Sequence, residues 1–79
     1  MSEVHQNYLW DLGFLIRDDA IEARRSSSPT GDSADLAFEA GRRMAYYEVL
    51  SLMTHQAKVF GLPLSDLNLA DLDLERDVL

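Results

Sequence analysis

The apolar residues of this chain recur at helical spacing in two long segments, and the segment from 33 to 60 shows the clearer pattern. Its first apolar stripe has alternating spacings of four and three residues and consists of Tyr46, Leu50, Met53, Ala57 and Phe60. A second stripe lies beside the first and consists of Ala37, Gly41, Ala45, Val49 and Leu52. Such spacings are typical of a helix that packs against other helices. Because one neighbour cannot cover both stripes, we expect a helix over residues 33–60 with more than one helical partner.

The segment from 3 to 25 is the other predicted helix. Ser2 is a suitable N-cap, Glu3 suits the positive first turn, and Arg25 suits the negative last turn. The apolar face consists of Val4, Tyr8, Leu9, Leu12, Leu15, Ile16, Ala20 and Ala23, and it is widened by Trp10, Phe14 and Ile21. Gly13 lowers helix propensity in the middle of this segment. We therefore expect Gly13 either to admit a close neighbour or to mark a bend.

A polar connector at residues 26–32 joins the two helices, and its serines, proline and glycine favour a loop. We expect Asp32 or Ser33 to cap the second helix. Short connectors join antiparallel neighbours, so the sequence predicts a two-helix hairpin. In the expected register Gly13 lies opposite Tyr46 and makes room for its ring.

The C-terminal segment, residues 61–79, combines leucine with acidic residues. Its glycine and proline are expected to end the preceding helix. A five-residue unit then recurs, with Leu62, Leu67 and Leu72 in equivalent positions. We expect a strap with one or two short helical turns, which lays its leucines on the hairpin and leaves its carboxylates in water.

The size of the chain limits the core that it can build alone. A chain of 79 residues buries only about 60% of the surface that its unfolded form exposes. It has no cysteine, which excludes disulfides and thiolate metal sites and leaves oligomerisation as the remedy. We therefore predict one all-α domain over residues 1–79, a hairpin that dimerises into a four-helix bundle.

The net charge of the chain limits the classes of partner that we expect it to bind. The net charge is −7, and residues 61–79 carry five acids against one base. An acidic surface repels phosphate backbones, so we expect no nucleic-acid partner. No segment approaches the roughly 20 apolar residues of a membrane span, and the N-terminus lacks the pattern of a signal peptide. We expect no membrane association and a cytoplasmic location.

Candidate chemistry is sparse. His5 and His55 are predicted at the same end of the hairpin, but the neighbouring acids lack the spacing of a metal-binding bundle. The acids near the C-terminus alternate, but they lack the glycine of a calcium loop. No nucleophile stands at recognisable spacing from a base and an orienting acid, and Arg17 with Arg43 is the remaining candidate for a site between subunits. We therefore assign no catalytic, metal-binding or cofactor-binding residue and expect no cofactor.

Three functions stay open. The favoured one is a non-enzymatic interaction or structural module that acts as a homo-oligomer, with a helical protein as another candidate partner. The alternative is a small acidic regulator that binds a basic protein or mimics nucleic acid, and the third is an enzyme with a site between subunits. The predicted oligomer seam consists of Ala37, Gly41, Ala45, Tyr46, Val49, Leu50, Met53, Ala57 and Phe60. The predicted contacts to another protein are Trp10, Asp66, Asp71, Asp73 and Asp77, since an exposed tryptophan often anchors an interface.

Overall fold

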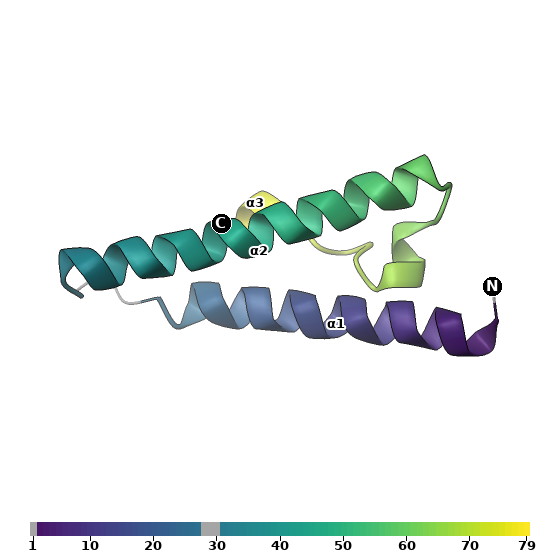
Figure 1. Cartoon of the computed structure of the whole chain (residues 1–79), viewed down its shortest axis with the longest axis horizontal. Coiled ribbons are helices and arrows are strands. Elements are labelled where there is room, and N and C mark those ends of the chain that lie inside the picture. Colours follow the sequence, from purple (N-terminus) through teal and green to yellow (C-terminus); the bar gives the residue numbers. More distant parts are fainter. Residues whose placement is uncertain (1, 28–30) are drawn as a thin grey trace.

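The protein is an all-helical hairpin followed by a short C-terminal strap (Figure 1). The computed structural model describes residues 2–27 and 31–79, and it contains no strand in those ranges. Its elements are α1 (Glu3–Arg25), α2 (Ser33–Val59), the 3₁₀ turn η1 (Leu64–Leu67) and α3 (Leu74–Asp77). The predicted all-α class and the two long helices are confirmed. Residues 28–30 of the predicted connector lie outside the described residues.

Local side-chain chemistry sets the ends of both helices. The Ser2 hydroxyl accepts a hydrogen bond from the His5 backbone N–H, and the Asp32 carboxylate accepts one of 2.9 Å from Asp35 N–H. Asp32, one of the two predicted caps, is therefore the N-cap of α2. Helix α2 ends at Val59, one residue earlier than predicted, and Gly61 follows with the positive φ of 68° that glycine tolerates best.

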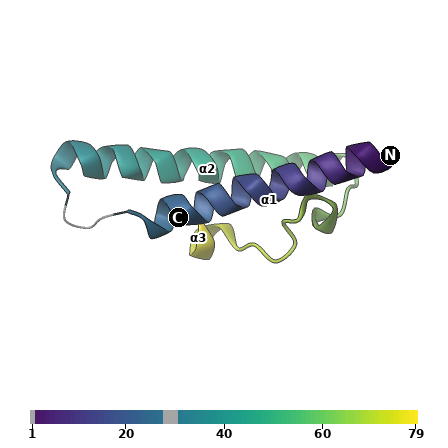
Figure 2. The same ribbon diagram turned by 90° about the horizontal axis from the view of Figure 1, so that it is seen from below.

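The molecule is elongated, with extents of 47 × 21 × 18 Å. Helices α1 and α2 run antiparallel along its length, and the strap (residues 61–79) returns along one side of the pair (Figure 2). The turn η1 contacts α1, and α3 contacts α2. We call the side that carries the strap the strap face.

The core lies under the strap. Its buried residues come from all three parts of the chain and are Ala20, Leu50, Ala57, Leu67, Leu69 and Val78. Half-buried side chains surround them, namely Ile16, Tyr46, Tyr47, Met53, Leu62, Leu64, Leu72 and Leu74. The strap thus supplies half of the buried cluster, and its leucines pack on the hairpin as predicted.

Gly13 is the place where the strap approaches α1 most closely. A Cβ added to Gly13 would lie only 1.8 Å from the backbone oxygen of Leu67. The expected close neighbour is therefore present, but it is the backbone of η1 and not the ring of Tyr46. The prediction was wrong about the neighbour because η1 packs on α1 at this position, and the expected register of the hairpin took no account of the strap.

Candidate functional site

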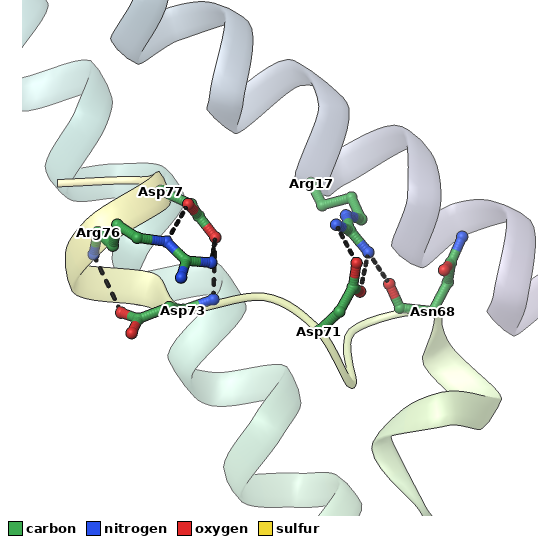
Figure 3. Close-up of polar contacts among 6 residues, drawn as sticks. All are labelled: Arg17, Asn68, Asp71, Asp73, Arg76 and Asp77. Atoms are coloured by element: carbon green, nitrogen blue, oxygen red, sulfur yellow. Dashed lines mark hydrogen bonds and ion pairs between the residues drawn. The ribbon is translucent and has the colours of Figure 1, made fainter.

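Hydrogen bonds and an ion pair attach the middle of the strap to α1 (Figure 3). The Arg17 guanidinium donates to both carboxylate oxygens of Asp71, at 2.7 and 3.3 Å, and to the backbone oxygen of Asn68 at 2.7 Å. The hydrogen bond from Arg17 lowers the pKa of Asp71, and the same bond raises the pKa of Arg17. A two-oxygen pairing of this kind sets orientation as well as attraction. Arg17 therefore binds the strap to α1 through Asp71 and Asn68.

A second set of polar bonds organises α3 at the end of the strap. Arg76 donates from its side chain to both carboxylate oxygens of Asp77, at 2.8 and 3.0 Å, while Asp73 accepts from Arg76 N–H at 3.0 Å. The side-chain bond from Arg76, together with a backbone bond from Asp73, lowers the pKa of Asp77 to about 2. The Tyr47 hydroxyl donates to Glu75 at 3.2 Å and ties α3 to α2.

The four acids that were predicted to contact another protein differ in whether their carboxylates form bonds within the chain. Asp71, Asp73 and Asp77 direct their carboxylates into the strap and its attachment. Asp66 is exposed, and its carboxylate has no hydrogen-bond or ion-pair partner among the residues that the structure describes. Asp66 is therefore the member of that set whose carboxylate is available to a partner.

An apolar groove of about 420 Å³ lies between α1 and α2, and Leu62 and Leu67 of the strap contribute to its lining. Its lining residues are Leu9, Leu12, Ile16, Val49, Met53, Gln56, Ala57, Phe60, Leu62 and Leu67. Further exposed apolar side chains widen this surface along both helices, namely Val4, Tyr8, Leu15, Ala45 and Leu52. We call the groove and these flanking residues the open face. It is an apolar candidate interaction surface.

The predicted oligomer seam is divided between the core and the surface. Leu50 is 0% exposed and Ala57 is buried, so the chain itself covers them and a second chain cannot reach Leu50. Tyr46 and Met53 are half-buried against the same core. The remaining predicted seam residues are exposed, namely Ala37, Gly41, Ala45, Val49 and Phe60. Among the predicted seam residues, Leu50 is thus completely covered by its own chain, in a core to which the strap contributes.

Three residues of α1 belong to the open face although the sequence assigned them to the core. Val4, Tyr8 and Leu15 are exposed apolar side chains. Their spacings of four and seven residues place them on one side of the helix. That spacing was visible in the sequence, but it does not distinguish a side chain covered by its own chain from one left bare.

Trp10 lies on a different side of α1 from the open face. It is exposed and stacks on Phe14, with the ring centroids 6.4 Å apart and the planes 8° from parallel. A cleft of about 260 Å³ separates it from η1, lined by Gln6, Asn7, Trp10, Ser65 and Asp66. The structure thus brings together two of the predicted partner contacts, Trp10 and Asp66.

The remaining candidate groups of the sequence do not form one site. Arg43 donates to the Ser27 hydroxyl, and Arg17 is held by Asp71, so these two arginines do not point at a common ligand. His5 bonds to the Ser2 hydroxyl, and His55 is exposed on α2. Within residues 2–27 and 31–79, no group of three or more metal-ligating side chains gathers.

Comparison with known proteins does not identify a relative of this chain. No protein-family model, curated protein or solved structure matches this chain significantly. Over the described ranges, the helices are each too short in apolar sequence to cross a membrane. The geometry of the two surfaces therefore carries the functional argument.

Proposed function

We propose that this protein is a small interaction module that pairs with a second copy of itself through the open face and forms a four-helix bundle. The observation that carries the proposal is the groove between α1 and α2, whose lining is apolar apart from Gln56. Burial of such a surface is the main favourable contribution to association. The proposal retains the cytoplasmic location expected from the sequence.

The total exposed surface supports a partner of about this size. The chain exposes 5458 Å², whereas a folded monomer of 8.9 kDa exposes about 4,800 Å². The surplus of about 650 Å² approaches the roughly 800 Å² that each partner buries in a standard interface. A second copy is the simplest occupant, because a two-fold axis brings the same apolar residues of both chains together.

The shape of the open face favours helices as the covering elements. Gly41 and Ala45 present little side-chain bulk along α2, and a Cβ added to Gly41 meets no atom within 4 Å. Val49 and Phe60 project beside the groove and can enter the groove of a second copy as ridges enter grooves.

A matched pair of substitutions tests this proposal. Val49 lines the groove, whereas Met44 does not and lies about 140° around the same helix. Their exposures are nearly equal, 44% and 46%. Val49→Glu should place a charge in the apolar interface and lower the mass measured by light scattering from twice 8.9 kDa to 8.9 kDa. Met44→Glu should leave the mass at the dimer value.

Circular dichroism of both variants checks that the helices persist, since glutamate is a good helix former. A dimer that survives Val49→Glu, or a wild-type chain that remains monomeric up to millimolar concentration, would contradict the proposal. A loss of the dimer in both variants would also contradict it, because the interface would then not be confined to the open face.

A further inference from the structure

Trp10, which stacks on Phe14, lines one side of a cleft that has an aspartate on its other side. Trp10 is 50% exposed and Phe14 is 44% exposed, and the two rings lie nearly parallel. Across the cleft, η1 contributes Ser65 and the unpartnered carboxylate of Asp66. A large apolar ring held next to a free carboxylate combines two features that recognise the same kind of ligand.

That ligand is a cation with a flat or apolar body. A guanidinium group stacks on the face of tryptophan, which attracts cations more strongly than the other aromatic rings do. The same group donates paired hydrogen bonds to a carboxylate. The side-chain amides of Gln6 and Asn7, which also line the cleft, can accept hydrogen bonds from the remaining guanidinium N–H groups.

We propose that the cleft between Trp10 and Asp66 binds an arginine side chain in a basic segment of another protein. The guanidinium stacks on Trp10 and donates to Asp66. The overall charge of −7 attracts a basic segment from a distance. Arg17, which lies two helical turns from Trp10, does not compete with the incoming guanidinium for Asp66, because Arg17 is already paired with Asp71.

The cleft is separate from the dimer surface. It is lined by residues of α1 and η1, whereas the groove of the open face is lined mainly by other residues of α1 and by α2, with Leu62 and Leu67 of the strap. None of the five residues around the cleft lines the groove. A dimer would therefore present two such clefts, one on each copy, and the failure of either proposal leaves the other standing.

The intrinsic fluorescence of Trp10, the single tryptophan of the chain, reports binding directly. The probe is the capped peptide Gly-Arg-Gly-Gly-Arg-Gly, and its control replaces each arginine with uncharged citrulline. We expect a saturable change with the arginine peptide, weakened by added salt, and none with the citrulline peptide. Asp66→Asn should weaken binding about tenfold by removing a charge-assisted acceptor.

Glu48→Gln is the matched control, because it removes one negative charge from an exposed position of α2. It should leave the affinity nearly unchanged, which separates contact at Asp66 from the general charge of the protein. Trp10→Leu, followed by calorimetry since the reporter is lost, should abolish the heat of binding. Circular dichroism confirms that each variant retains its helices.

The proposal is overturned if the citrulline peptide changes the fluorescence as much as the arginine peptide. It is also overturned if Asp66→Asn and Glu48→Gln behave alike, if Trp10→Leu binds like the wild type, or if millimolar arginine peptide leaves the fluorescence unchanged.

Discussion

The strap face and the open face are built from the same two helices and differ in what covers them. On the strap face, Leu67, Leu69 and Val78 fill the space against α1 and α2, and Arg17 fastens the strap through Asp71. On the open face, apolar side chains such as Leu52 and Phe60 remain exposed. The difference teaches that the chain itself covers the apolar residues of one side of the helix pair and leaves those of the open face exposed.

The largest expected contrast is between two neighbouring leucines of α2. Leu50 is 0% exposed under the strap, whereas Leu52 is 60% exposed toward the open face. Leu50→Ala should lower the free energy of unfolding by about 2–5 kcal/mol, because it leaves a cavity in the core. Leu52→Ala should change it by no more than about 0.5 kcal/mol at a dilution where the protein is monomeric.

Urea denaturation of both variants measures this contrast. Equal losses for Leu50→Ala and Leu52→Ala would mean that the monomer covers both faces. Because Leu50 is buried in the core, Leu50→Asp is not a suitable test of association. A buried charge would unfold the chain before it separated two copies.

A smaller contrast is expected between two glycines. Gly13→Ala would place a Cβ 1.8 Å from the Leu67 oxygen, whereas the same change at Gly41 meets no atom within 4 Å. Gly13→Ala should therefore push η1 away and cost about 2 kcal/mol of stability despite its better helix propensity. Gly41→Ala should instead stabilise the helix by up to about 1 kcal/mol.

Hydrogen exchange of the strap amides locates the Gly13 effect. The exchange of Leu67 and Leu69 N–H groups should quicken in Gly13→Ala and stay unchanged in Gly41→Ala. Normal protection of the strap in Gly13→Ala would show that the close approach of η1 to α1 does not hold the strap.

The smallest expected effect is the acid sensitivity of the strap face. The lowered pKa of Asp71, and that of Asp77 at about 2, lie below the value of about 3.9 for an unfolded aspartate. The unfolded chain therefore binds more protons between these values, so both carboxylates stabilise the fold above about pH 4 and lose that effect as the pH falls toward 2. Exposure of Asp71 to water keeps the effect small.

Urea midpoints measured from pH 6 down to pH 2 test this sign. Asp71→Asn and Asp77→Asn should each reduce the decline of the midpoint with acid, and the change should be smaller than the Gly13→Ala loss. A decline that is as steep in both variants as in the wild type would contradict the role given to these carboxylates.

The contrast between the faces also explains what the sequence could predict. The helices and their caps depend on neighbouring residues, so Ser2, Asp32 and Gly61 marked their ends to within one residue. The docking of the strap depends on residues far apart in the chain, such as Gly13 with Leu67 and Arg17 with Asp71. Periodicity identified both apolar stripes of α2, but it did not tell which side chains the strap would cover.

The residues of the candidate site could be predicted from the sequence, but their arrangement in space could not. Trp10 and Asp66 were each recognisable as contact residues, one as a tryptophan at the edge of an apolar face and the other as an acid of the tail. Their meeting across one cleft depends on where η1 docks on α1. The loss of Asp71, Asp73 and Asp77 as free acids depends on the same docking.

The most direct test of the account is an isotope-filtered NMR experiment on a mixture of labelled and unlabelled chains, which detects contacts between copies. The account predicts intermolecular signals from the Val49 and Leu52 methyl groups of the open face. It predicts none from the buried strap residues Leu69 and Val78, which pack on their own chain and do not line the groove. Intermolecular signals from Leu69 or Val78, or none from the open face, would contradict the account.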